Sequence, residues 1–155
     1  MLEFKEIEIN DYEEFKLISE EILDKHIKNR PDIYKKGNPL SNEYFLFLLN
    51  DEDTISIKAV YDNKIVGISV IEIKDAPISP IVHEREFAFI DTFGVLKEYQ
   101  GQGIGQRLFD KSIEYIKMMG INKVELLVWE FNEQAIKFYE KNTMNTLNRT
   151  LELII

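Results

Sequence analysis

Cysteine is absent from the 155 residues of this chain. Its absence excludes disulfide bonds, a zinc–thiolate site and a cysteine nucleophile, and it fits a reducing compartment. The sequence also has no internal repeat, no low-complexity tract and no segment that resembles a linker. These absences leave no point at which to divide the chain, so we predict one domain over residues 1–155.

Long apolar runs are missing too. No segment approaches the roughly 20 apolar residues that a membrane-spanning helix needs. Residues 1–6 lack the basic start and the apolar run of a signal peptide. We therefore expect a soluble cytoplasmic protein with no membrane partner.

Positive charge is scarce, because 19 Lys and Arg face 28 Asp and Glu, which gives a formal net charge of −9. Nucleic-acid binding requires clustered Lys and Arg against the phosphates, so we expect no nucleic-acid partner. The acidic balance suits a surface that keeps the protein in solution, and it also leaves cationic amine substrates open.

Apolar residues are plentiful, at 45% hydrophobic and 12% aromatic, which is enough for a substantial core. The first half of the chain predicts an alternation of short elements. They are a strand over 3–9, a helix capped by Asn10 or Asp11 that Arg30-Pro31 interrupts, a helix from Ser41, and a hairpin of 54–61 and 64–74 around Asp62-Asn63.

The second half has the pattern of strand, helix, strand, helix and strand. The expected strands are 86–95, 123–129 and one within 147–155, and the helices are 102–119, ended by Gly120, and 133–141. An antiparallel first half that leads into one βαβ unit makes a mixed, mostly antiparallel sheet flanked by helices. The predicted fold class is therefore α/β with a central mixed sheet.

The most informative stretch is Gln100-Gly101-Gln102-Gly103-Ile104-Gly105, between an apolar strand and an amphipathic helix. Its glycines allow a ligand close to the backbone, and the unpaired N–H groups of the next helical turn favour an anion. A loop that only turns a corner remains open. A nucleoside-triphosphate loop needs Gly-Lys-Ser/Thr, and a dinucleotide fingerprint needs Gly-x-Gly-x-x-Gly, so both fit worse.

The same six residues resemble the signature of the GNAT superfamily of acyl-CoA-dependent N-acyltransferases: Gln or Arg, two residues, Gly, one residue, then Gly or Ala. A second stretch, residues 128–141, is similar to the family region in which an Asn precedes the last helix and a Phe-Tyr pair lies on it. The resemblance covers essentially the whole chain. It implies a GNAT-like fold and transfer of an acetyl group from acetyl-CoA to a primary amine of a small molecule or peptide, by direct attack, without a covalent enzyme intermediate and without a metal.

The resemblance also implies which residues hold the coenzyme. Backbone N–H groups of the signature, Gln100, Gly101, Gln102, Gly103, Ile104 and Gly105, would hold the pyrophosphate. The strand end at Phe93, Gly94 and Val95 would pair with the pantetheine arm and polarise the thioester carbonyl, although Gly94 equally suits a bulge or a packing contact. Asn132 would hydrogen-bond the arm, while a plain helix cap explains it as well. Arg107, Lys137 and Lys141 are candidates for the coenzyme phosphates or are simply solvated.

For the chemistry, the resemblance assigns Tyr139 to protonation of the departing thiolate, against the alternative of a tyrosine that only packs. An alkylamine with a pKa near 10.4 is mostly protonated at pH 7, so a base is useful. Asp91 is the candidate base or amine-binding group, and Glu86 and a water chain are the alternatives.

The acceptor is expected between the first helices and the later loops, with walls formed by His26, Tyr34, Tyr44 and Phe45. Acidic runs such as Glu20-Glu21 either favour a cationic amine or are exposed faces. Transfer of a longer acyl group and a non-catalytic sensor module are the alternative functions, and the resemblance also allows a homodimer. One departure from the family is Asn142-Thr143-Met144, which lacks the usual glycine, so we expect Asn142 to end the last helix in the left-handed conformation.

Overall fold

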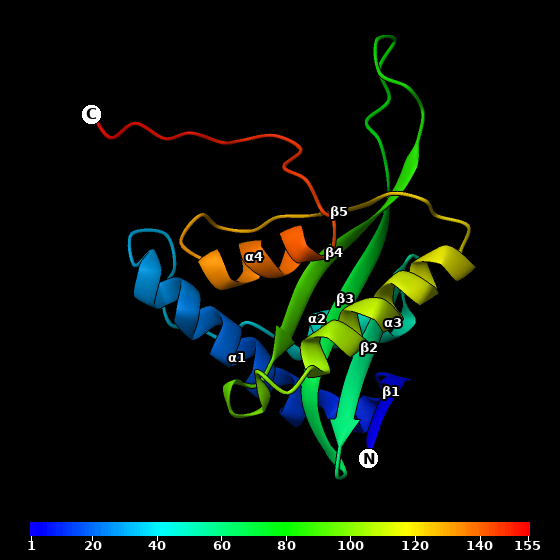
Figure 1. Ribbon diagram of the computed structural model, residues 1–155, viewed down its shortest axis with the longest axis vertical. Helices are drawn as coiled ribbons and strands as arrows, with labels where there is room; N and C mark the ends of the chain where they lie inside the picture. Colours follow the sequence, from blue (N-terminus) through cyan, green and yellow to red (C-terminus); the bar gives the residue numbers. More distant parts are fainter.

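The protein, seen in a computed structural model that describes residues 1–155, is a five-stranded sheet with helices on both faces (Figure 1). The elements in chain order are β1 (Leu2–Glu6), the 3-10 turn η1 (Ile9–Asp11), α1 (Tyr12–Asn29), α2 (Asn42–Asn50), β2 (Thr54–Tyr61), β3 (Lys64–Asp75), β4 (Glu86–Val95), η2 (Lys97–Tyr99), α3 (Ile104–Met118), β5 (Val124–Leu126) and α4 (Glu133–Lys141). The strands lie in the order of the sequence. The first four are antiparallel and β5 is parallel to β4, which confirms the mixed, mostly antiparallel sheet.

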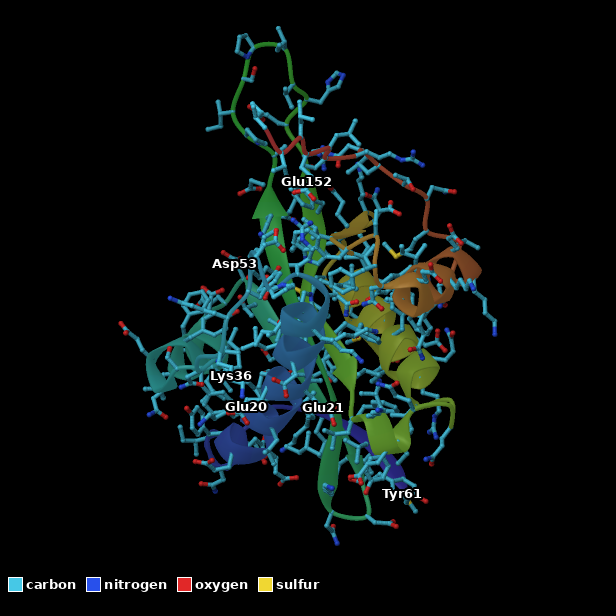
Figure 2. The ribbon with its side chains drawn as sticks, turned by 90° about the vertical axis from the view of Figure 1, so that its left-hand side faces the viewer. Glu20, Glu21, Lys36, Asp53, Tyr61 and Glu152 are labelled. Atoms are coloured by element: carbon cyan, nitrogen blue, oxygen red, sulfur yellow. The ribbon has the colours of Figure 1, made fainter.

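The sheet separates two apolar cores because successive strand residues point to opposite faces. On one face, α1 and α2 cover a cluster that contains Phe15, Phe45, Ile68 and Val70. On the other face, α3 covers a second cluster around Leu108, against which the aromatic rings of α4 pack. Figure 2 shows α2 on one side of the strands and α3 and α4 on the other.

Local sequence signals fix several boundaries as predicted. The Ser41 hydroxyl accepts a hydrogen bond from the Tyr44 N–H at 3.1 Å and so caps α2. Asp62 and Asn63 both have positive φ, as a tight hairpin turn between β2 and β3 requires. Gly120, with a φ of +77°, follows the end of α3.

The predicted last strand within 147–155 is wrong, and the strand predicted at 123–129 is reduced to Val124–Leu126. A strand needs a neighbour to pair its backbone, and the chain after α4 runs away from the sheet (Figure 1). Leu151 and Leu153 are 88% and 86% exposed, so their alternation meets no partner. Glu152 pairs instead with Arg30 at the end of α1, at 2.9 Å.

The end of α4 also differs from expectation. Asn142 keeps a negative φ of −88°, and Thr143 takes the left-handed conformation at +64°. Thr143 N–H donates to Glu140 O and Met144 N–H donates to Tyr139 O, the pair of bonds that closes a helix in this conformation. Asn142 uses its side chain instead to bond Gln106 at the start of α3, at 2.7 and 3.2 Å. Thr143 therefore bears the backbone strain.

None of the helices combines the length and the apolar content that a passage across a lipid bilayer requires.

Candidate active site

The second half of β4 has a strand neighbour on one side only. The ladder to β5 pairs Ala88, Phe89 and Ile90 and then stops, whereas the ladder to β3 continues to Val95. Asp91 is the extra residue of a bulge in that second ladder, because Ile71 faces Ile90 and Val70 faces Thr92.

The alternation of the ladder shows which N–H groups are left free. The Leu96 N–H donates to Val66 O of β3 at 2.9 Å, so the N–H groups of Gly94 and Thr92, two and four residues earlier, point the same way. The N–H groups of Phe93 and Val95 point to the other edge of β4, where β5 no longer pairs with it. Two backbone donors are therefore available there to an extended ligand or to an oxyanion.

Beyond β4, the glycine-rich loop presents a row of free donors. Gly101 and Gly103 have φ of +74° and +78°, and nothing lies within 4 Å of where a Cβ would stand on either. No N–H group from residue 101 to residue 106 donates a hydrogen bond within the protein. The last of these belong to the first turn of α3, whose dipole adds positive potential. An anion fits this loop.

The side chains of two signature residues hold the loop in place. The Gln100 N–H already donates to Lys97 O at 3.2 Å, so it is not among the free donors, and its side-chain amide donates to Val95 O at 2.8 Å. The Gln102 side chain reaches Glu98 O at 3.3 Å, while its own N–H stays free. Gln100 thus ties the loop to the end of β4.

Gly94 leaves room for α1 to pack against β4. A Cβ at this position would stand 2.6 Å from Cδ1 of Ile22 on α1, so the missing side chain lets α1 lie against β4. Ile104 and Gly105 continue into α3, with the Ile104 side chain in the core beside Leu108.

Tyr139 lies on α4 in a group of aromatic rings. Its ring centroid is 6.4 Å from that of Phe93 and 6.2 Å from that of Phe109. Burial raises the pKa of Tyr139 to about 12, so the phenol keeps its proton at neutral pH. Its hydroxyl has no hydrogen-bond partner within the protein. The arrangement leaves a proton donor free beside the unpaired half of β4.

Asn132 caps α4, as its position before Glu133 predicted. Its side-chain oxygen accepts from the Ala135 N–H at 3.4 Å and from Lys25 Nζ at 2.7 Å. The Lys25 contact ties the end of α1 to the start of α4, and the Asn132 amide NH₂ has no protein partner.

Asp91 and Glu86 are separated by the length of the strand. Asp91 is exposed and accepts from the Thr92 hydroxyl at 3.1 Å. Burial, then the charges of Asp91 and Glu72, raise the pKa of Tyr44 to about 12. Glu86 begins β4, about 16 Å from Asp91 at a rise of about 3.3 Å per residue, so it is too remote to share the same site.

A cavity of about 200 Å³ opens beside Thr92, the residue after Asp91, between α1, α2 and the sheet. Of the four predicted walls, His26, Tyr34 and Tyr44 line it, whereas Phe45 is buried in the core at 2% exposure. The remaining lining residues are Phe15, Ser19, Ile22, Leu23, Pro39, Leu40, Leu48, Val70 and Thr92. No Asp, Glu, Lys or Arg is among them.

Some candidate residues lie elsewhere. Glu20 and Glu21 stand on the outward face of α1, apart from this cavity (Figure 2). The Arg107 guanidinium lies over the Phe4 ring of β1, 5.6 Å from its centroid.

Ser19 and Thr92 also line the cavity, although neither is predicted from the sequence. The signal for Ser19 is the helical spacing that places it one or two turns from Ile22, Leu23 and His26 on α1. Nothing in the sequence indicates that the bulge turns Thr92 toward the same space.

A sequence model of the acetyltransferase (GNAT) family matches residues 13–143. The chain belongs to the GNAT acetyltransferase family. The matched residues include the glycine-rich loop and the strand before it, which agrees with the resemblance of the loop to the GNAT signature.

Three similar proteins extend this result. An uncharacterized N-acetyltransferase of Methanocaldococcus jannaschii is 31% identical over 70% of this chain and 46% of its own length. N-alpha-acetyltransferase 60 of Xenopus tropicalis is 29% identical over 64% of this chain and 46% of its own. This GNAT chain thus matches about half the length of these two relatives. A mutant of the BH1408 protein of Bacillus halodurans, solved by crystallography, superposes with a TM-score of 0.94 and 29% identity over 99% of both chains.

The residues present fit the acyl-CoA that the GNAT family implies. The loop offers N–H groups without acceptors and glycines whose missing Cβ atoms leave open space. The metal-free expectation stays a prediction, and no group of three or more His, Asp or Glu side chains is arranged to hold a metal ion.

Proposed function

We propose that this GNAT protein transfers the acetyl group of acetyl-CoA to a primary amine by direct attack, without a covalent enzyme intermediate. The observation that carries the proposal is the row of free N–H groups over residues 101–106, directly after a strand whose last half has no partner on one side. The row suits a pyrophosphate, and the strand edge suits the amide-bearing pantetheine arm. The bound coenzyme supplies an activated acetyl thioester.

Different groups of the protein bind the arm, stabilise the developing negative charge and donate the proton. The N–H groups of Phe93 and Val95 pair with the arm, and one of them donates to the carbonyl oxygen as negative charge develops there. The Asn132 amide adds a donor at the start of α4. The phenol of Tyr139 donates to the departing sulfur, and its pKa of about 12 keeps it in the donor form.

The lining of the cavity supports one class of acceptor. Its lining is apolar apart from hydroxyl groups and one imidazole, which supports an amine attached to an apolar substituent rather than a polyamine. One similar protein bears the name N-alpha-acetyltransferase, which supports an α-amine. We therefore infer that the acceptor is an α-amino group whose neighbouring side chain is apolar.

The test combines binding and turnover. Acetyl-CoA is titrated into the protein by calorimetry, and release of the CoA thiol is followed with short peptides that differ only in a first residue of Leu, Lys or Glu. We expect binding, and a kcat/KM at least about tenfold higher for the Leu peptide, which equals about 1.4 kcal/mol. Absence of binding contradicts the proposal. Binding without turnover on any amine supports the sensor alternative, and faster transfer from a longer acyl-CoA corrects the donor.

A further inference from the structure

The C-terminal turns of α1 bring a histidine to the acceptor cavity. Ile22 packs where a side chain of Gly94 would stand, and His26 follows one helical turn later on the same face of α1. His26 and Thr92 line the same cavity. The imidazole thus lies one turn beyond the point at which α1 touches the unpaired half of β4.

The imidazole is held in a defined tautomer. His26 Nδ1 lies 2.7 Å from the Ile22 carbonyl oxygen. Because a carbonyl only accepts hydrogen bonds, Nδ1 carries the hydrogen, and the Nε2 of the neutral ring has a free lone pair. The ring packs edge-on against Tyr34 and Phe131, with centroids 5.0 and 5.7 Å away.

The charged and titratable groups around the ring are occupied elsewhere, and His26 forms no ion pair. Lys25 donates to Asn132 Oδ1, Arg30 pairs with Asp32 and Glu152, and the Tyr34 hydroxyl accepts from Trp129 Nε1. Across the cavity, Tyr44 belongs to the lining and Asp91 stands close to Tyr44. His26 is therefore the one basic side chain in the cavity wall, and its Nε2 forms no hydrogen bond within the protein.

We propose that His26 Nε2 accepts the proton of the acceptor amine, directly or through one water; this inference rests on the proposed acetyl transfer. As the amine nitrogen bonds to the carbonyl carbon, one N–H proton passes to Nε2. The carbon–sulfur bond breaks, and the sulfur takes one proton from the Tyr139 hydroxyl. The imidazolium gives its proton to solvent, and the phenolate recovers one, so the net products are the amide and the CoA thiol.

General chemistry favours this base over a carboxylate. A base is most effective when it titrates near the working pH, and an imidazole ordinarily titrates near 6.5, whereas an Asp titrates near 3.9. Asp91 is then free to attract the amine before it reacts.

His26→Asn separates the chemical role from a structural one. Asn29 and Asn50 each donate their side-chain amide to the carbonyl four residues earlier, at 2.8 and 2.7 Å. An Asn at position 26 can therefore keep the bond to the Ile22 carbonyl, yet it offers no base. The other histidine of the chain, His83, is exposed in the loop between β3 and β4, so His83→Asn is the matched control.

The assay measures kcat with one α-amine peptide from pH 5 to 9 for the three proteins, together with acetyl-CoA binding. We expect His26→Asn to lower kcat at pH 8 by about 100-fold or more, with unchanged acetyl-CoA affinity, and His83→Asn to match the wild type. The amine titrates in every variant, so the ratio of wild-type to His26→Asn rates isolates the imidazole. This ratio should fall toward one as the pH drops through the range in which imidazoles titrate.

A ratio that stays constant with pH, or a His26→Asn kcat within threefold of the wild type, overturns the role of His26 and leaves acetyl transfer intact. Absence of wild-type turnover overturns both. A nitrogen NMR spectrum of the imidazoles gives a readout without substrate: we expect the Nδ1–H tautomer for His26, and the Nε2–H tautomer contradicts the proposal.

Discussion

Gly103 and Gly120 form a matched pair at the two ends of α3. Their φ values are +78° and +77°, and a Cβ on either would meet nothing within 4 Å. Gly103 borders the free N–H groups of the loop, whereas Gly120 lies at the opposite end of the helix. Substitution of each by Ala therefore imposes the same backbone strain at two chemically different places.

The stability cost should be alike for both variants. An L-residue in the left-handed conformation costs roughly 1–2 kcal/mol. For a chain of this size, each kcal/mol lowers Tm by about 2–4 °C. We expect Gly103→Ala and Gly120→Ala each to lower Tm by about 2–8 °C, measured by calorimetry or circular dichroism.

Their effects on binding should differ. The added methyl of Gly103→Ala occupies open space beside the proposed pyrophosphate donors, so we expect the Kd for acetyl-CoA to rise at least about tenfold, or about 1.4 kcal/mol. Gly120→Ala should bind as the wild type does. Equal Kd values for the two variants, at equal loss of stability, would refute the assignment of the coenzyme to this loop.

Four further substitutions test the proposed acid, the end of α4 and the buried ion pair. Tyr139→Phe should lower kcat by about 100-fold with little change in acetyl-CoA affinity, whereas Tyr115→Phe, on α3, should leave kcat unchanged. Thr143→Gly relieves the positive φ and should raise the unfolding free energy by about 1 kcal/mol in denaturant melts. Asp11→Ala removes the acceptor 2.7 Å from the buried Lys58 ammonium and leaves it only the exposed Glu8 carboxylate at 3.0 Å, which should cost about 1–3 kcal/mol in the same assay.

Two control variants and one pH dependence test the predictions on the free energy of unfolding. Thr146→Gly, in the exposed segment after α4, should give no gain, and Glu114→Ala, in an exposed ion pair, should cost less than about 1 kcal/mol. Burial lowers the pKa of Lys58, but hydrogen bonds to Asp11 and Glu8 outweigh burial and raise it above 10.5. Between neutral pH and pH 10.5 the contribution of this pair is therefore complete, and it is lost as the pH rises through the raised pKa. A loss already between pH 7 and 9 contradicts this reading.

Features set by a few neighbouring residues were predictable from the sequence. The Asp62-Asn63 turn, the Ser41 cap and the Gly120 stop depend on backbone conformations and hydrogen bonds that these residue types favour locally. The cavity walls His26, Tyr34 and Tyr44 were predictable as well, once the order of elements had indicated where the first helices meet the sheet.

Features that depend on residues far apart in the chain were not predictable from the sequence. The alternating apolar residues of 147–155 suit a strand, but a strand forms only where another backbone pairs with it. The left-handed position at the end of α4 lies at Thr143, while the side chain of the preceding Asn142 bonds Gln106 on α3. Gln100 likewise contributes its side chain to the end of β4, a contact that the signature alone did not predict.

The most direct test of acetyl transfer to an amine follows both products of one reaction. The protein is mixed with acetyl-CoA and a peptide that begins with an apolar residue, and free CoA thiol and N-acetylated peptide are quantified together. We expect equal amounts of the two products, with no acetyl group on the protein at any time. Thiol release without acetylated peptide, or an acetylated protein that later passes its acetyl group to the peptide, would contradict direct transfer to an amine.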